Sequence, residues 1–157
     1  MGIGPGKRPL NRTDGFTIIE LIVIVAIIGV IAGIAGPSMS RITRHDRTNR
    51  AATVIAADIQ NAFALAGRQR APVRIEADAA TKSYTFTDRK TGKVLRIRSF
   101  YGNTSEFMLN QLAFNPATID VYPSGVSSAA LTVQLANGDY SRTITASTAG
   151  FVRVVPR

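Results

Sequence analysis

Residues 15–37 read GFTIIELIVIVAIIGVIAGIAGP, and this stretch decides how the chain is organised. Glu20 is its only charged residue, and Thr17 is its only other polar one. A helix of about 21 residues rises by about 1.5 Å per residue and is roughly 31 Å long, the thickness of the hydrocarbon core of a bilayer. The stretch therefore predicts a membrane-spanning helix over residues 16–37.

Glu20 is the exception in this helix. A carboxylate inside the apolar layer costs on the order of 2.5 to 3.5 kcal/mol on insertion scales, and such groups tend to be functional. One interpretation is that Glu20 finds a cationic partner within the membrane. The alternative is that it lies near the helix end and reaches the interface.

The hexapeptide GFTIIE (residues 15–20) follows a short basic segment and opens the apolar run. In this it resembles the type IV prepilin signal of type IV pilins and type II secretion pseudopilins. The resemblance implies that a prepilin peptidase cleaves after Gly15 and methylates the new amine of Phe16. It also implies that Glu20 pairs with the terminal amine of a neighbouring subunit in a filament of pilins or pseudopilins. An ammonium group beside a carboxylate would offset two burial costs at once.

Residues 1–15 are rich in Gly, Pro and cations, and they are interpreted as a leader that is removed. The alternative is a secretory signal cut before Gly36, after the small residues Gly33 and Ala35; the length of the apolar run and Glu20 disfavour it. The cations that follow the apolar run rival those of the leader, so charge bias leaves the orientation open. The resemblance implies a cytoplasmic N-terminus before processing, a single pass through the inner membrane, and a periplasmic C-terminal domain.

Small residues within the apolar run indicate a helix-packing face. Gly29 and Gly33 form a GxxxG spacing, which lets another helix approach closely. Pro37 removes a backbone donor and predicts a kink just past the membrane.

Residues 38–67 keep helical spacing and predict an amphipathic continuation of the same helix. Its apolar stripe, which we expect to pack on a sheet, consists of Ile55, Ile59, Ala62, Phe63 and Ala66. Gly67 is the predicted C-cap. Three arginines at spacings of three residues predict an exposed basic strip, with a solvated His45 within it: Arg41, Arg44 and Arg47.

Residues 68–157 change to a period of two and predict a β-rich head. The strands are expected at 73–77, 84–87, 95–98, 118–122, 131–135, 140–146 and 151–155. Residues 88–93 and 136–139 are predicted hairpin turns, and residues 102–117 are predicted to form a loop with at most one helical turn. The fold class is therefore α+β: a long N-terminal helix packed against a domain of small antiparallel sheets.

Composition limits the function. The chain has 157 residues, no Cys, no Trp and one His, so it offers few groups for an active site or a metal site. We therefore expect no catalytic residue, no metal, no cofactor and no small-molecule substrate; a membrane-anchored hydrolase is the weakest alternative, because His45 has no evident nucleophile partner. The net charge of +9 suggests anionic partners, or else a solvated basic surface.

Later segments make the resemblance narrower. Residues 64–73 (ALAGRQRAPV), 121–125 (VYPSG), 142–144 (RTI) and 150–154 (GFVRV) resemble the GspH/FimT family of minor pseudopilins and minor pilins. The resemblance implies a non-enzymatic minor pseudopilin, processed by a prepilin peptidase and acting in type II protein secretion. The alternative it implies is a FimT-like minor type IV pilin that binds DNA during uptake.

The DNA-binding alternative depends on particular arginines. Relatives that bind DNA carry Gly-Arg-x-Arg near the C-terminus, whereas this chain has Phe151 in place of the first arginine and keeps only Arg153. Arg96 and Arg98 are further candidates for nucleic-acid contact, and strand alternation predicts that they share an outer sheet face with Arg74. Together these residues predict weak, salt-sensitive DNA binding.

Overall fold

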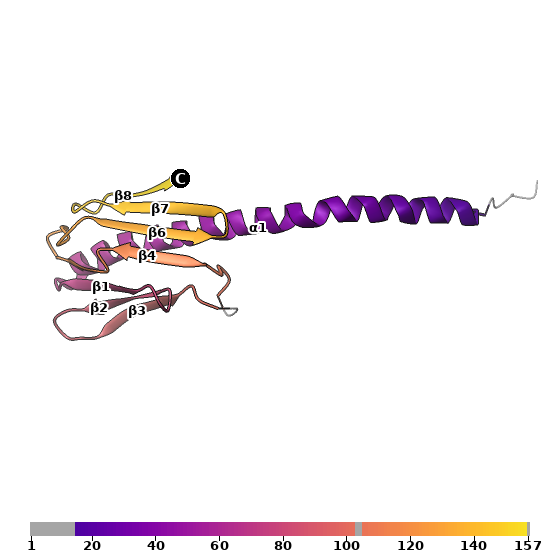
Figure 1. Cartoon of the computed structure of the whole chain (residues 1–157). Helices are drawn as coiled ribbons and strands as arrows, with labels where there is room; N and C mark the ends of the chain where they lie inside the picture. The colour runs from indigo at the N-terminus through magenta and orange to yellow at the C-terminus, as the bar shows by residue number, and fades with distance from the viewer. Residues whose placement is uncertain (1–14, 103–104, 157) are drawn as a thin grey trace, which may run out of the picture. The chain divides into compact units, whose positions relative to one another are not determined.

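The computed structural model describes residues 15–102 and 105–156, apart from the side chains of residues 34–38 and of Pro156. Figure 1 shows one long helix followed by strands. The chain divides into two compact units, Met1–Met39 and Ser40–Arg157. The predicted leader lies outside the described residues except for Gly15, and so do the side chains of Gly36 and Pro37, on which the predicted kink depends.

The predicted N-terminal helix is present as α1 (Ile18–Gln69), which has 52 residues. The prediction that Gly67 caps its C-terminus is wrong, because Gly67 is still helical. The helix ends instead at Gln69, and the next residue, Arg70, has a φ of 51° and is followed by Ala71 and Pro72. A proline cannot continue the helix and disfavours helical geometry in the residue before it, so the proline sets this boundary.

The membrane-spanning segment predicted for residues 16–37 is not recognised in the part of the chain that the structure describes: none of its helices is both long enough and apolar enough to cross a membrane.

The head contains antiparallel sheets, as predicted, and there are two of them with four strands each. The first has the order β3-β2-β1-β5 and the second the order β4-β6-β7-β8. Their strands are β1 (Val73–Asp78), β2 (Ser83–Asp88), β3 (Val94–Ser99), β4 (Gln111–Asn115), β5 (Thr118–Val121), β6 (Leu131–Asn137), β7 (Tyr140–Ala146) and β8 (Val152–Pro156). The first sheet thus takes most of the earlier strands, and the second takes β4 and the C-terminal strands.

Strand β4 was missed, because residues 102–117 were predicted to form a loop. The turn signals at either end, Gly102 and Asn115-Pro116, outweighed the short alternation of Leu112 and Phe114 between them. Leu112 is buried in the structure, and β4 pairs with β6 from Gln111↔Ala136 to Asn115↔Thr132. The strand is therefore stabilised by burial and by its partner rather than by a strong local signal.

A single hydrophobic cluster joins α1 to both sheets. The helix contributes buried side chains at the predicted spacing of four, three and four residues: Ile55, Ile59, Ala62 and Ala66. The first sheet contributes the inward face of its strands, including Tyr84 and Phe86, and the second contributes Val133 and Ile144. Only one face of each sheet is buried in this cluster, which explains the alternating pattern of the strands.

The predicted turns are present where the sequence places them. Asn137 pairs with Tyr140, so β6 and β7 are joined by the two-residue loop Gly138-Asp139, and Gly138 has a φ of 62°. A glycine tolerates this left-handed conformation without steric cost.

Candidate functional site

The N-terminal motif lies at the start of α1. The backbone N–H of Glu20 donates to the side-chain oxygen of Thr17 at 3.2 Å, so Thr17 caps the helix. Phe16 precedes the cap outside the helix and is 79 % exposed. The bond between Gly15 and Phe16 therefore lies in an accessible, non-helical segment. The T-x-x-E spacing that predicts this cap was present in the sequence but was not used.

Glu20 lies in the first turn of the helix. Its carboxylate is exposed and has no hydrogen-bond or ion-pair partner among the residues that the structure describes. A carboxylate near the positive end of the helix dipole is favourable, but only by about 0.3 to 1 kcal/mol when exposed. The predicted pairing of Glu20 with another subunit remains a prediction.

The predicted helix-packing glycines face open space. A methyl group added at Gly29 or Gly33 would meet nothing within 4 Å. Large apolar side chains surround them on the same helix and are exposed, with Ile27 and Ile31 at 54 % and 60 %. This part of α1 is thus apolar all round, which is the pattern of a helix that is covered by other apolar groups.

In the head, a buried carboxylate on α1 binds side chains of β2 and β3 in the first sheet, and it was not predicted from the sequence. The side chain of Asp58 on α1 is only 6 % exposed. Its oxygens accept hydrogen bonds from the Tyr84 hydroxyl at 2.6 Å, from Arg96 at 2.5 Å and from the Nε of Arg98 at 2.6 Å. The aspartate interrupts the apolar stripe between Ile55 and Ile59, and this interruption was the signal that could have revealed it.

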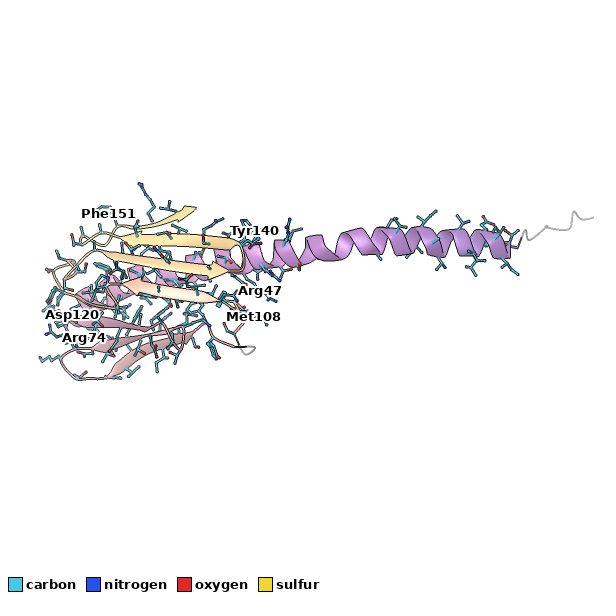
Figure 2. All side chains as sticks on the ribbon, in the orientation of Figure 1. Arg47, Arg74, Met108, Asp120, Tyr140 and Phe151 are labelled. Carbon is cyan, nitrogen blue, oxygen red and sulfur yellow. The ribbon has the colours of Figure 1, made fainter. Side chains whose placement is uncertain are left out.

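The predicted outer face shared by Arg74, Arg96 and Arg98 is wrong. Arg98 and Arg96 pair with Tyr84 and Phe86, so they lie on the inward face of the sheet, toward the helix. Arg74 lies on the opposite face, where it donates to Asp120 at 2.9 Å. Figure 2 shows Arg74 and Asp120 together at one end of the head. Alternation along each strand was predicted correctly, but the pairing register decides which face the arginines share.

These contacts alter the acidity of the groups. Burial raises the pKa of the Tyr84 phenol, and its hydrogen bond to Asp58 adds to the effect. The hydrogen bond to Asp58 raises the pKa of Arg98, and the hydrogen bond from Arg74 lowers the pKa of Asp120. Arg96 and Arg98 therefore form ion pairs with Asp58 inside the head, and the negative charge of Asp58 weakens their attraction for an external anion.

The basic strip of the helix is only partly exposed. Arg47 is half-buried and donates to the Met108 sulfur at 3.1 Å. Figure 2 labels both residues on this part of the head. His45 is not simply solvated, because its ring lies 5.0 Å from the Tyr140 ring, and its Nε2 lies 3.2 Å from the Arg142 guanidinium. Arg142 thus connects the helix to β7. Among the described residues, no group of His, Cys, Asp and Glu could hold a metal ion.

The C-terminal candidate residues lie on the edge of the second sheet. Phe151 is 79 % exposed, and Arg153 on β8 is exposed as well. Figure 2 shows Phe151 at the outer margin of the β4-β6-β7-β8 sheet. The structure does not bring Arg153 together with Arg96 and Arg98, since the latter two belong to the other sheet.

Comparisons with known proteins agree with both parts of the chain. A family described as the prokaryotic N-terminal methylation motif matches residues 10–36. The type IV minor pilin FimU of Pseudomonas aeruginosa is 21 % identical in sequence, with a TM-score of 0.57, and the match covers 73 % of this chain and 92 % of FimU. The minor pseudopilin EpsH from the type 2 secretion system of Vibrio cholerae is 17 % identical, with a TM-score of 0.54, and the match covers 70 % of this chain and 97 % of EpsH. No curated protein matches the chain significantly.

The two kinds of match are independent, because one rests on the N-terminal sequence and the other on three-dimensional structure. They confirm the predicted α+β pilin-like fold and the predicted prepilin motif. The chain therefore carries an N-terminal methylation motif over residues 10–36 and has the α+β fold of minor pilins and minor pseudopilins.

Proposed function

We propose that the chain is a non-enzymatic minor pseudopilin subunit of an inner-membrane-anchored filament that acts in type II protein secretion. The observation that carries this proposal is the combination of an exposed Gly15-Phe16 bond, a capped helix start and an unpaired Glu20 in an apolar helix. A prepilin peptidase would cleave the bond, and other pilins or pseudopilins would cover the helix. The head then lies on the periplasmic side.

The same geometry supports the proposed pairing of Glu20 with a neighbouring subunit. Cleavage after Gly15 leaves a new amine on Phe16, four residues before Glu20 and at the same end of the helix. Neighbouring subunits that are staggered along the filament can therefore place the amine of one beside the carboxylate of the next. Within an apolar bundle this ion pair offsets the desolvation of both charges, whereas either charge alone keeps its penalty.

A Glu20→Ala variant tests this role. We expect it to insert into the membrane normally, because the change deletes a charge from the apolar segment, but to be lost from filaments, because the amine of the neighbouring subunit stays unpaired. The measurement is the fraction of the protein that is recovered with filaments sheared from cells. Glu76→Ala, which removes an exposed carboxylate from the head, is the matched control and should assemble normally. Normal assembly of Glu20→Ala would contradict the pairing and favour the interfacial interpretation of this residue.

The second candidate function is that of a minor type IV pilin that binds DNA during uptake. It is favoured by the net charge of +9 and by the exposed Arg153. The contacts of Arg96 and Arg98 with Asp58 count against it, as does Phe151 in the position where a second guanidinium would be needed. Deletion of the gene separates the two functions, since the first predicts loss of protein secretion and the second predicts loss of DNA uptake.

A further inference from the structure

Strand β8 forms an open edge of the second sheet. The sheet has the order β4-β6-β7-β8, and no other strand of the described residues pairs with β8 on its far side. Figure 1 shows β8 at the margin of the sheet. An edge strand presents backbone donors and acceptors that can pair with another chain.

The register identifies which backbone groups face this open edge. The N–H of Ser147 donates to the carbonyl of Phe151 at 2.9 Å, and Thr145 pairs with Arg153 two residues further on. In an antiparallel pair, hydrogen-bonded positions alternate with outward-pointing ones. Val152 and Val154 therefore turn their N–H and C=O groups away from β7. Pro156, the next position of this parity, has no N–H, so the open ladder ends there.

The two edges of the first sheet, β5 and β3, are protected in ways that β8 is not. The edge of β5 is covered by the following loop, since Ser128 N–H donates to the Asp120 carbonyl at 2.8 Å, and Val121 forms a bridge with Ser127. The pairing of β3 has a register shift between Phe86 and Thr87. Loops and bulges of this kind block strand addition. The register of β8 on β7 is continuous from Arg142↔Pro156 to Ala146↔Val152.

The side chains of β8 give the edge a chemical pattern. Val152 packs against the hydrophobic core, so Phe151, Arg153 and Val155 lie on the opposite, outer face. All three are exposed, with Phe151 at 79 % and Val155 at 38 %. The outer face of β8 thus presents an apolar, a cationic and an apolar side chain in turn.

The turn before β8 holds Phe151 in place. The N–H of Phe151 donates to the Ser147 hydroxyl at 3.1 Å, and Gly150 has a φ of 80°. A methyl group added at Gly150 would lie 3.0 Å from the Phe63 ring on α1. The start of the edge is therefore ordered before any partner binds, which lowers the entropic cost of binding.

We propose that β8 is a docking edge for an extended segment of another protein, which adds a strand to the sheet and places a carboxylate opposite Arg153 with apolar side chains over Phe151 and Val155. The position opposite Arg153 is a non-hydrogen-bonded one, where side chains approach most closely, so an opposite charge there is favourable. A second copy of β8 fits less well, because antiparallel self-pairing brings Arg153 opposite or diagonal to the Arg153 of the other copy. The edge belongs to the head alone, so this docking does not depend on which machine the subunit serves.

The probe is an acetylated and amidated peptide, Thr-Val-Thr-Glu-Thr-Val-Thr, which carries the complementary pattern. It is titrated into the full-length, isotope-labelled protein in detergent micelles, and amide chemical shifts and hydrogen exchange are followed by NMR. We expect shifts centred on residues 151–155 and slower exchange of the Val152 and Val154 amides, which are open in the free protein. A peptide with Lys in place of Glu should bind about fivefold more weakly, a difference of about 1 kcal/mol, since an attraction to Arg153 becomes a repulsion.

Three variants separate strand addition from other contacts. Val154→Pro removes one outward N–H and should abolish binding, while Val154→Ala keeps the N–H and should bind normally. Arg153→Glu should reverse the preference, so that the Lys peptide binds more tightly than the Glu peptide. The proposal would be overturned by the absence of shifts at residues 151–155, by equal binding of both peptides, by binding that survives Val154→Pro, or by self-association of the free protein through β8.

Discussion

At the scale of single residues, Asp58 shows what a sequence pattern could not resolve. The stripe on α1 was correctly predicted to face a sheet, but the carboxylate within it was passed over. Its partners, Tyr84, Arg96 and Arg98, are 26 to 40 residues away in the sequence. Only the strand register brings them to one place, and that register depends on the turn lengths and on burial rather than on local propensity. The arginines were therefore recognised as important but were assigned to the wrong face.

An Asp58→Ala variant should be strongly destabilised. The change leaves two guanidinium groups and one buried hydroxyl without their acceptor, and removing one partner of a buried ion pair costs about 3 kcal/mol. Because the arginine side chains are 35 % and 32 % exposed, water compensates part of this loss, and we expect about 2 to 3 kcal/mol. The measurement is the free energy of unfolding of the head by urea, followed by fluorescence of its tyrosines.

Asp46→Ala is the matched control for this prediction. Asp46 also pairs with an arginine, Arg50, but both side chains are largely exposed on one helix face. Such an i,i+4 pair contributes about 0.3 to 0.5 kcal/mol. Equal losses of stability in the two variants would mean that the buried Asp58 cluster stabilises the head no more than an exposed ion pair does.

At the scale of elements, the hydrophobic periodicity of the sequence correctly predicts most of the helix and strands. The change from a period of 3.6 to a period of two, after Pro72, correctly separated the helix from the strands, because burial of one face imposes these periods. The sequence misplaces the end of one element, the helix, and misses another, strand β4. The helix runs on to Gln69, past Gly67, and β4 was hidden among turn residues. In both cases the position of the element depends on long-range packing, which a local glycine or asparagine does not reveal.

Replacing either of two glycines by alanine should change the stability of the head, but in opposite directions. Gly67 lies within α1 with nothing within 4 Å of an added methyl group, so Gly67→Ala should stabilise the head by about 0.5 to 1 kcal/mol. Gly150 has a positive φ and a close Phe63 ring, so Gly150→Ala should destabilise it by about 1 to 2 kcal/mol. Urea titrations of both variants beside the wild type give the two signs. A loss of stability in Gly67→Ala would restore the glycine as a helix cap.

At the scale of the whole molecule, charge and geometry give different indications about DNA. The net charge of +9 favours phosphate contact, whereas Arg74, Arg96 and Arg98 all have carboxylate partners within the head. We therefore expect the full-length protein in detergent to bind DNA weakly, with an affinity that falls steeply as salt rises, because the binding depends on counterion release. A mobility-shift titration at several salt concentrations measures this.

Arg153→Ala is the decisive variant for that titration. A diffuse basic surface loses little when one of many cations is removed, so its affinity should change only slightly. Tight, salt-tolerant binding that disappears in Arg153→Ala would contradict the secretion assignment and support the DNA-uptake function. Phe151 would then act as a stacking group for a base.

The central claim is that the chain is a prepilin-like precursor whose N-terminal motif is processed. Its two supports are the methylation motif over residues 10–36 and the exposed Gly15-Phe16 bond before the Thr17 cap. The most direct test is intact-protein mass spectrometry of the chain after co-expression with a prepilin peptidase, with a chain expressed alone as the control. The account predicts a product that has lost residues 1–15 and begins with N-methylated Phe16. An unprocessed chain in the presence of active peptidase, or a cut near Gly36, would contradict it.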